Sequence, residues 1–299
     1  MNPKQELGRR LQAGIKESEP MSLHTSWKVG GPADYYLLPA DEGELQEIVR
    51  YGNKTGLPLF VFGNGTNLLV RDGGIRGLVV HLGAPFNYIY REGSSLRAGA
   101  GTPLTMLARE AAKEGLGGLG FGAGIPGSLG GALVMNAGAF GSYIGRLVSK
   151  IRLVRFDGKA ITLGREDIVF GYRKSNLAEK GIIVEALLEL GKGDSEELNR
   201  EVEHCLAERR RRHPALPSAG SVFRNPPERP AGSLIEEAGG KGLSVGPARV
   251  SEKHANFIIN PGGASAGDIE ELIERVRRLV REKFAVELQA EVRIIGEKR

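Results

Sequence analysis

Residues 115–145 read GLGGLGFGAGIPGSLGGALVMNAGAFGSYIG, and glycine is by far the commonest residue in this segment. It holds 12 glycines in 31 positions, and the whole chain holds 44 in 299. That share is about twice the usual one of about 7%. A glycine-every-third period does not run through the chain, which excludes a collagen-like structure. Glycine at this density marks backbone that bends sharply or lies close to another group, so we expect the segment to grip a ligand that carries phosphate.

One part of this segment imitates a dinucleotide-binding fingerprint. Residues Gly122–Gly127 match the string G-x-G-x-x-G. We reject a Rossmann turn because no clear strand precedes the string, Pro126 lies inside it, and Leu147 stands where an acidic residue is required about 20 positions on. What remains is a glycine-rich run to Gly131, followed by Asn136–Ala139.

A second loop has the same character. Gly63-Asn-Gly-Thr-Asn67 directly follows the apolar run 57–62, which predicts a strand. Successive backbone N–H groups in such a turn can converge on an anion. The loop lacks the Gly-Lys-Ser/Thr of a Walker A motif, and the strand-like run 68–70 follows it where a Rossmann turn would have a helix. Taken alone, a simple hairpin turn explains the loop equally well.

Composition narrows the class of protein. The chain is 40% hydrophobic and 26% charged, as is usual for soluble globular proteins. Cys205 is the single cysteine, which excludes a disulfide framework, and five scattered histidines predict no metal site. The net charge of +5 comes from basic residues mixed with acids, which favours an anionic small molecule over nucleic acid. A charged N-terminus and the lack of an apolar run of about 20 residues predict a cytoplasmic protein without membrane insertion.

Hydrophobic periodicity and turn residues predict a mixture of helices and strands, hence an α+β fold. The predicted strands cover residues 57–62, 68–70, 79–82, 150–156 and 181–190, and the predicted helices run over 102–115, 195–212 and 265–284. We expect Thr102, Ser195 and Ser265 to cap these helices, and Asp157-Gly158 to form a hairpin turn. The alternation over residues 286–294 predicts a further strand. Its polar face would carry Glu287, Gln289, Glu291 and Arg293.

Several motifs, taken together, resemble one enzyme family. They are Gly63–Leu68, Gly124–Ala132, Asn136–Ala139, Phe170–Ser175, His213–Pro226, Val250–Asn256 and Glu291–Arg293. In this order they resemble UDP-N-acetylenolpyruvoylglucosamine reductases, the MurB enzymes of peptidoglycan synthesis in cell-wall biogenesis. The resemblance spans nearly the whole chain.

The resemblance implies an α+β fold with a two-part FAD-binding region, like that of the PCMH or vanillyl-alcohol-oxidase proteins, and a C-terminal α+β substrate-binding domain. We place the FAD-binding region at residues 1–194, with subdomains at about 1–83 and 84–194. The substrate-binding domain covers residues 195–287. Residues 288–299 are expected to form a strand that returns to the FAD-binding region.

The resemblance also implies a reaction, with FAD as the bound cofactor and NADPH as the co-substrate. NADPH reduces FAD and leaves, and hydride then passes to the enolpyruvyl group of UDP-N-acetylglucosamine enolpyruvate, which gives UDP-N-acetylmuramate. By resemblance, Arg173 stabilises the developing enolate, since a guanidinium suits a planar carboxylate. Ser221 matches the proton donor. Glu291 matches the third catalytic residue, which polarises the enolpyruvyl group or relays protons.

Binding residues carry over from the matching motifs. Those expected to bind FAD are Gly63, Asn64, Gly65, Thr66, Asn67, Leu68, Gly122, Ile125, Pro126, Gly127, Gly130, Gly131, Ala132, Asn136, Gly138, Ala139, Ile183 and Arg293. Those expected to contact substrate are Tyr172, Asn225, Lys253, His254 and Asn256. No metal is implied, and a monomer is expected.

Some positions depart from the family pattern. Arg224 stands where lysine is more usual, and Phe140 where tyrosine is common. No long insertion separates Arg173 from Ile182, so the chain resembles the branch that lacks a substrate-binding tyrosine loop. That leaves open how the UDP end is held. The Arg209–Arg212 run is interpreted as a solvated helix end.

Two other hypotheses stay open from the sequence. The chain could be another FAD-dependent oxidoreductase of the same fold, although the Ser221 and Glu291 segments speak against a sugar or alcohol oxidase, which needs no such proton donor. It could instead be a basic binding module without enzymatic activity, which a purified protein without flavin absorbance would favour.

Overall fold

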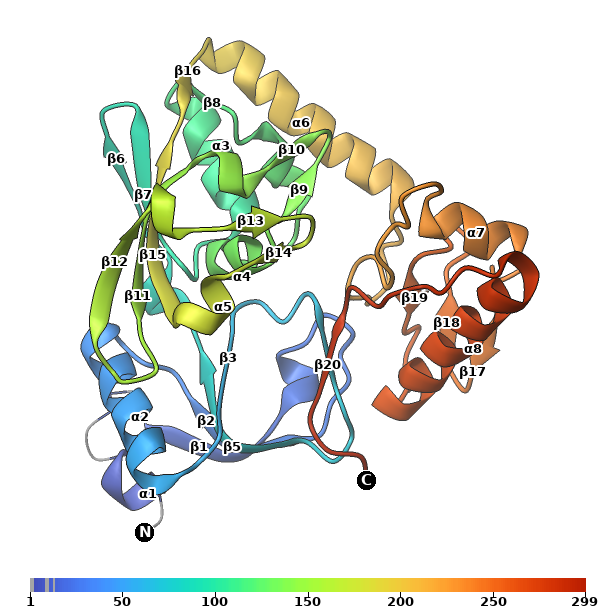
Figure 1. Cartoon of the computed structure of the whole chain (residues 1–299), viewed down its shortest axis with the longest axis horizontal. Coiled ribbons are helices and arrows are strands. Elements are labelled where there is room, and N and C mark those ends of the chain that lie inside the picture. Colours follow the sequence, from blue (N-terminus) through green and yellow to red (C-terminus); the bar gives the residue numbers. More distant parts are fainter. Residues whose placement is uncertain (1–2, 9–10, 13) are drawn as a thin grey trace. The chain divides into compact units, whose positions relative to one another are not determined.

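The computed structural model describes residues 3–8, 11–12 and 14–299 (Figure 1). The helices are α1 (Pro3–Glu6), α2 (Glu42–Thr55), α3 (Leu104–Lys113), α4 (Leu129–Val134), α5 (Leu177–Lys180), α6 (Ser195–Arg212), α7 (Ala231–Glu237) and α8 (Ala266–Phe284). The strands are β1 (Ile15–Pro20), β2 (Pro32–Leu37), β3 (Leu59–Phe62), β4 (Leu68–Val70), β5 (Ile75–His81), β6 (Ile89–Glu92), β7 (Ser95–Gly99), β8 (Leu116–Gly117), β9 (Gly138–Ala139), β10 (Ser142–Tyr143), β11 (Val148–Val154), β12 (Ala160–Gly164), β13 (Phe170–Gly171), β14 (Lys174–Ser175), β15 (Ile182–Glu189), β16 (Gly191–Lys192), β17 (Ser244–Val245), β18 (Ala248–Val250), β19 (Ile258–Ile259) and β20 (Arg293–Ile295).

The chain divides into two compact units, each assembled from separate segments. Unit 1 comprises the described residues up to Glu17 together with Tyr35–Asn64 and Gly77–Arg209. Unit 2 comprises Ser18–Asp34, Gly65–Arg76 and Arg210–Arg299. The mixture of helices and strands confirms the predicted α+β class. The predicted domain boundaries at residues 194 and 287 stay a prediction.

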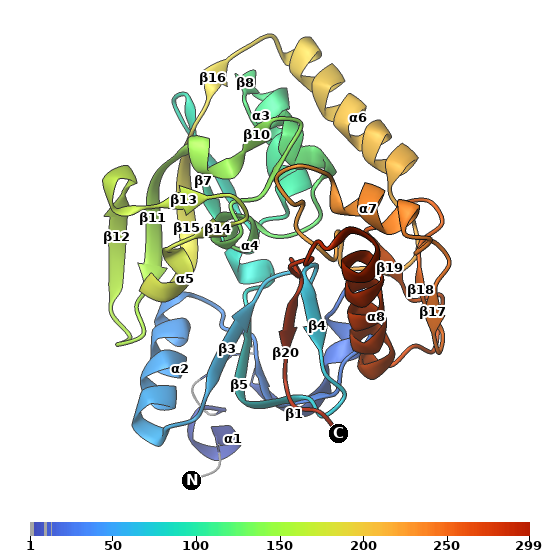
Figure 2. The ribbon, with the colours of Figure 1, turned by 45° about the vertical axis from the view of Figure 1, so that its right-hand side comes forward.

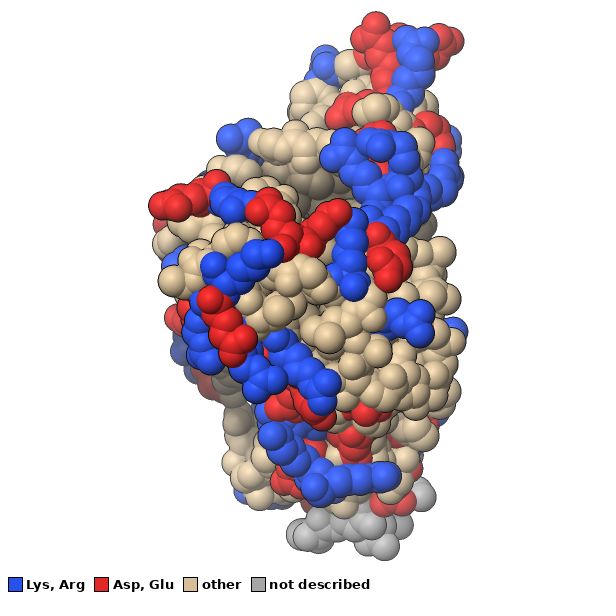
Figure 3. All heavy atoms as spheres, turned by 90° about the vertical axis from the view of Figure 1, so that its right-hand side faces the viewer, with Lys and Arg blue, Asp and Glu red and all other residues tan. Residues whose placement is uncertain are grey.

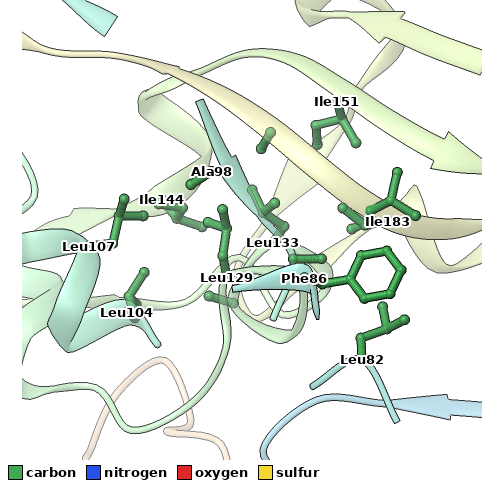
Figure 4. Packing of buried hydrophobic residues seen from close by; sticks show 14 of the residues in the cluster. Leu82, Phe86, Ala98, Leu104, Leu107, Leu129, Leu133, Ile144, Ile151 and Ile183 are labelled. Atoms are coloured by element: carbon green, nitrogen blue, oxygen red, sulfur yellow. The ribbon is translucent and has the colours of Figure 1, made fainter. Parts of the chain in front are cut away.

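Unit 1 is built around a five-stranded antiparallel sheet in the order β12-β11-β15-β7-β6. Helices α3 and α4 pack on it, because each presents one apolar face. In α4 that face is Leu129, Ala132 and Leu133, three buried residues at helical spacing. Figure 4 shows Leu129 and Leu133 among the apolar side chains of the sheet and of α3. This packing fixes where the glycine-rich segment around α4 lies in unit 1.

Unit 2 has a core of its own, to which α8 contributes the largest helical face. Ser265 caps α8, its hydroxyl accepting the Asp268 N–H, and the Asp268 carboxylate accepts the Ser265 N–H in return. The buried face of the helix is Ala266, Ile269, Leu272, Ile273, Val276 and Val280. The predicted helix, its cap and its apolar face are therefore confirmed.

Most predicted strands are confirmed, with shifted ends. The 57–62 and 79–82 runs lie in β3 and β5, which pair in parallel, and the 68–70 run is β4. Asp157-Gly158 does turn a hairpin, which joins β11 to β12. Strand β12 itself was not predicted from the sequence.

Two predicted helix caps are wrong. The Thr102 hydroxyl donates to the Tyr88 carbonyl at 3.0 Å, and Pro103 takes the cap position of α3 without a side-chain hydrogen bond. At α6 the carboxylate of Asp194 accepts the N–H groups of Glu196 and Glu197, both at 3.0 Å. An aspartate one residue earlier reaches these donors, which leaves Ser195 inside the helix.

The predicted strand over residues 286–294 is also wrong, although its burial pattern is confirmed. Leu288 and Val292 are buried, but the regular strand is limited to β20, which pairs in parallel with β4 (Figures 1 and 2). Before β20 the chain is extended and makes one isolated bridge, between Ala290 and Phe223. Its hydrogen bonds go to loop residues there, so alternation alone did not identify a sheet strand.

Candidate active site

The glycine-rich segment of unit 1 turns tightly into α4. Gly127 has φ +142°, which a side chain rarely tolerates, and Ser128 then caps the helix by accepting the Gly131 N–H at 3.5 Å. The N–H groups of Leu129 and Gly130 donate to the carbonyls of Thr102 and Ala100, both at 2.8 Å. These bonds tie the start of α4 to the loop between β7 and α3.

The structure brings the two predicted phosphate loops together within unit 1. A Cβ placed on Gly63 would lie 2.0 Å from the hydroxyl oxygen of Ser128, so the two backbones touch at this point. At Gly131, in contrast, a Cβ would meet only the same hydroxyl, at 3.6 Å. Packing within the unit therefore does not require glycine at 131. A bare, exposed backbone there fits the close approach of a flat, extended cofactor such as FAD.

The remainder of the second loop belongs to unit 2. Gly65 has φ +61°, and a Cβ there would lie 2.0 Å from the His24 carbonyl oxygen. Asn67 links this loop to the C-terminal segment. Its Nδ2 donates to the Glu291 carbonyl at 3.2 Å, and its own carbonyl accepts the Arg293 N–H at 3.0 Å. Asn67, which is predicted to bind FAD, and Glu291, which is predicted to be catalytic, are thus in direct contact.

Arg173 lies at the tip of the β13–β14 hairpin in unit 1. Its Nη1 donates to the Gly138 carbonyl at 3.0 Å, which ties the hairpin to the segment after α4. Two more bonds join the same elements. The buried Asn136 Nδ2 donates to Gly171, and the Ser175 hydroxyl donates to Val134, both at 2.9 Å. Three hydrogen bonds therefore join the Arg173 hairpin to α4 and the segment after it, and one of the three is made by the guanidinium itself.

Backbone strain gathers in the same two loops. Of the six non-glycine residues with positive φ among the described residues, three are Asn136 at +43°, Phe140 at +51° and Arg173 at +53°. Each costs about 1–3 kcal/mol and persists only where surrounding contacts enforce it. Such strain is common where side chains must be aimed at a ligand. Phe140 and Tyr172 are also largely exposed, at 55% and 59%.

Ser221 and Glu291 lie on neighbouring backbone segments of unit 2. The Glu291 N–H donates to the carbonyl of Val222, the residue after Ser221, at 2.7 Å. The N–H of Arg224 donates to the Gln289 carbonyl at 2.9 Å, which continues the pairing. Both predicted catalytic side chains are partly exposed. A hydroxyl and a carboxylate are thus presented by two hydrogen-bonded backbone segments, which is an arrangement that can hold and move a proton.

The predicted substrate residues have varied settings. Tyr172 is exposed, as a contact residue should be. Asn225 Oδ1 accepts the Ala231 N–H at 3.0 Å, and Lys253 Nζ donates to the Arg210 carbonyl at 2.7 Å. Asn256, in contrast, is 3% exposed. Their contacts with substrate stay predictions.

Other predicted flavin residues also differ in exposure. Ile183 is buried in the core of unit 1, as Figure 4 shows, and Leu68 and Ala132 are buried as well. The side chains of these three residues therefore pack in the core, and any contact with the cofactor would have to come from their backbone atoms. The sequence prediction omits Ser128, which caps α4 at the point where the two loops touch. Its position before Leu-Gly-Gly-Ala is a helix-cap signal that could have revealed it.

Burial shifts the charge properties of two residues. Desolvation lowers the pKa of the Arg209 guanidinium to about 10. Arg209 is partly exposed and the next three arginines are exposed, which agrees with the predicted solvated helix end. Burial likewise lowers the pKa of His254, whose Nδ1 accepts the Asn256 N–H at 3.2 Å. That bond needs an unprotonated Nδ1.

On the face shown in Figure 3, basic side chains are interleaved with acidic ones.

Fold and matched segments together define an FAD-dependent oxidoreductase. Residues 33–164 match the family described as FAD binding domain. Residues 212–295 match the C-terminal domain of UDP-N-acetylenolpyruvoylglucosamine reductase. The chain belongs to the UDP-N-acetylenolpyruvoylglucosamine reductase family.

Individual relatives support that assignment over nearly the full length. The chain is 49% identical over 295 residues to the reductase of Heliobacterium modesticaldum, covering 98% of this chain and 94% of the relative. It is 42% identical to the Bacillus subtilis reductase, covering 98% and 97%. The crystal structure of the MurB reductase from Thermus caldophilus superposes with a TM-score of 0.82 at 37% identity, covering 94% of this chain and 99% of that one.

Two further observations concern metals and membranes. Among residues 3–8, 11–12 and 14–299, no group of three or more His, Cys, Asp or Glu side chains could hold a metal ion. Within the same ranges, none of the helices is long and apolar enough to cross a membrane.

Proposed function

We propose that this chain reduces UDP-N-acetylglucosamine enolpyruvate to UDP-N-acetylmuramate with NADPH, in peptidoglycan precursor synthesis. The observation that carries the proposal is the pairing of the Ser221 and Glu291 segments, through the Glu291 N–H and the Val222 carbonyl at 2.7 Å. It lies within a chain whose relatives are named for this activity. An enzyme that only oxidised a sugar or alcohol would not need a proton donor there.

Bound FAD supplies a hydride acceptor and donor between NADPH and substrate. The enolpyruvyl C=C bond gains hydride at its CH2 carbon and a proton at the neighbouring carbon, while NADPH becomes NADP+. Arg173 balances the negative charge that develops on the enolpyruvyl carboxylate, and its strained hairpin fixes the guanidinium in advance. Ser221 delivers the proton, and Glu291 polarises the group or relays protons to the hydroxyl.

The assignment of the flavin residues is part of the proposal. Gly63, Gly127 and Gly131 support it best, because their backbone turns or lies bare around the Ser128 cap. The flavin contacts of the loop from Gly65 to Leu68 and of Arg293 stay predictions. The predicted domain boundaries, cytoplasmic location and monomeric state stay predictions.

Ser221→Ala tests the proton-donor role. We expect flavin absorbance to fall with NADPH at the wild-type rate, because Ser221 takes no part in that half-reaction. Recovery of absorbance with the enolpyruvyl sugar nucleotide should slow about 100- to 10,000-fold, the usual contribution of a positioned acid. Anaerobic stopped-flow absorbance measures both half-reactions separately.

Ser244→Ala is the matched control, since Ser244 is an exposed serine of the same unit. It should leave both rates unchanged. If Ser221→Ala also leaves the second rate unchanged, Ser221 is not the proton donor.

A further inference from the structure

The buried side chain of Asn256 uses both ends of its amide on one backbone residue. Its Oδ1 accepts the Phe223 N–H at 2.9 Å, and its Nδ2 donates to the Phe223 carbonyl at 2.8 Å. The backbone carbonyl of Asn256 also accepts the Val222 N–H at 2.9 Å. Three hydrogen bonds thus fix the two residues that directly follow Ser221.

The opposite side of the same segment faces the other predicted catalytic residue. The Val222 carbonyl accepts the Glu291 N–H at 2.7 Å and the Val292 N–H at 3.5 Å. Residues 222–223 therefore lie between Asn256 and the Glu291 segment. A shift of Phe223 would displace Ser221 along the chain and Glu291 through this pairing.

We call the three hydrogen bonds between Asn256 and residues 222–223 the Asn256 clamp, and the turn that carries Asn256 is itself held in place. The Ser251 hydroxyl accepts the N–H groups of Lys253 and His254, at 3.2 and 3.4 Å. The Ser251 N–H donates to the Phe257 carbonyl at 2.8 Å, which closes the turn that carries Asn256. With 3% of the residue exposed and both amide ends engaged, the side chain of Asn256 has little left to offer a substrate directly.

We propose that Asn256 is a positioning residue, which acts through Phe223 to hold the Ser221 hydroxyl and the Glu291 carboxylate in register for the protonation step. This inference rests on the proposed function. Misplacing a reacting group by about 1 Å can cost about 100-fold in rate. Hydrogen bonds that fix the two residues next to Ser221 are therefore sufficient to control the rate of the protonation step. Flavin reduction by NADPH does not use Ser221, so it should not depend on the clamp.

Asn256→Asp tests the hydrogen bond donated by the amide separately from the one that it accepts. The introduced carboxylate can still accept the Phe223 N–H, but it cannot donate to the Phe223 carbonyl and instead places negative charge against it. A protonated carboxyl would restore the donor. Burial raises the pKa of a carboxyl above its ordinary value of about 3.9, so the clamp should recover as the pH falls.

Asn260→Asp is the matched control. Asn260 is also buried in unit 2, with its Nδ2 donating to the Trp27 carbonyl at 2.9 Å and its Oδ1 accepting the N–H groups of Gly262 and Ala264. Its side chain makes none of the bonds to residues 222–223. It therefore reports what a buried Asn→Asp change does to unit 2 in general.

The experiment is anaerobic stopped-flow absorbance of the FAD-loaded protein at pH 8 and pH 5.5. For Asn256→Asp we expect flavin reduction by NADPH within about twofold of wild type, and recovery with the enolpyruvyl sugar nucleotide slowed about 10- to 100-fold at pH 8. Most of that loss should be regained at pH 5.5, relative to wild type at the same pH. Asn260→Asp should not slow recovery selectively.

Hydrogen exchange supplies a readout besides activity. In Asn256→Asp at pH 8, the amides of Val222, Phe223 and Glu291 should exchange faster than in wild type, and in Asn260→Asp they should not. Equal recovery rates for wild type and Asn256→Asp, or an equal loss in both half-reactions, would overturn the positioning role alone. A wild-type protein that NADPH reduces but the enolpyruvyl substrate does not reoxidise would overturn the proposed function and this inference with it.

Discussion

Gly65 is a position in the second loop where the backbone leaves no room for a side chain. It combines φ +61° with a His24 carbonyl oxygen that would lie 2.0 Å from any Cβ. Gly65→Ala therefore adds a backbone clash to the usual left-handed strain. We expect its free energy of unfolding to fall by at least about 3 kcal/mol, measured by urea denaturation with FAD in excess.

Gly239→Ala is the comparison variant for this prediction. Gly239 is in the same unit, with φ +84° and nothing within 4 Å of a Cβ. It should lose only the conformational cost, about 1–2 kcal/mol. An equal loss in the two variants would contradict the close approach at Gly65.

Single residues also show the limits of sequence interpretation. Arg173, Ser221 and Glu291 could be named because whole motifs resemble a family. The clamp by Asn256 could not, because its partner Phe223 is 33 positions away and the pairing depends on tertiary structure. From the sequence, Asn256 was predicted to contact substrate, and its burial in unit 2 is what points to positioning.

At the scale of elements, α8 is tied to the loop after β4 by one ion pair. Arg71 Nε and Nη2 donate to the two carboxylate oxygens of Glu270, at 2.9 and 3.0 Å. The hydrogen bonds from Arg71 hold the pKa of Glu270 below its usual range. Glu270→Gln should lower the free energy of unfolding by about 1 kcal/mol at pH 7, as measured by urea denaturation.

The sign of the pH dependence follows from the lowered pKa. The ion pair stabilises the fold above the unfolded pKa of about 4.3, and this contribution is lost as pH falls through the lower, folded value. The difference between wild type and Glu270→Gln should therefore shrink below about pH 4.3. Glu274→Gln removes an exposed pair with Arg277 on the same helix and should change stability by less than about 0.5 kcal/mol. A difference for Glu270→Gln that is constant with pH would contradict the ion pair.

Elements with strong local signals were predicted well, and those fixed by distant partners were not. Helix α8 has a capping box and a continuous apolar face, both readable from sequence. The start of α6 was misjudged because Asp194 and Ser195 are both good caps and only the structure selects between them. The segment before β20 alternates like a strand but donates its hydrogen bonds to loops.

At the scale of the whole molecule, each unit draws on distant parts of the chain. Unit 2 joins residues 65–76 to residues 210–299, and the parallel pair β4–β20 belongs to it. A sequence prediction that divides the chain at single boundaries cannot describe a unit that is built from separate segments. The family resemblance nevertheless predicted the α+β fold and the FAD-binding class, because it rests on motifs from both units.

The most direct test of the central claim is anaerobic NADPH oxidation by the purified, FAD-containing protein, followed at 340 nm with and without UDP-N-acetylglucosamine enolpyruvate. We predict that at most one NADPH per bound FAD is oxidised without the sugar nucleotide. With it, oxidation should continue, with one UDP-N-acetylmuramate formed for each further NADPH consumed. NADPH oxidation that stops at one equivalent per flavin even when the sugar nucleotide is present, or a purified protein that contains no flavin, would contradict the account.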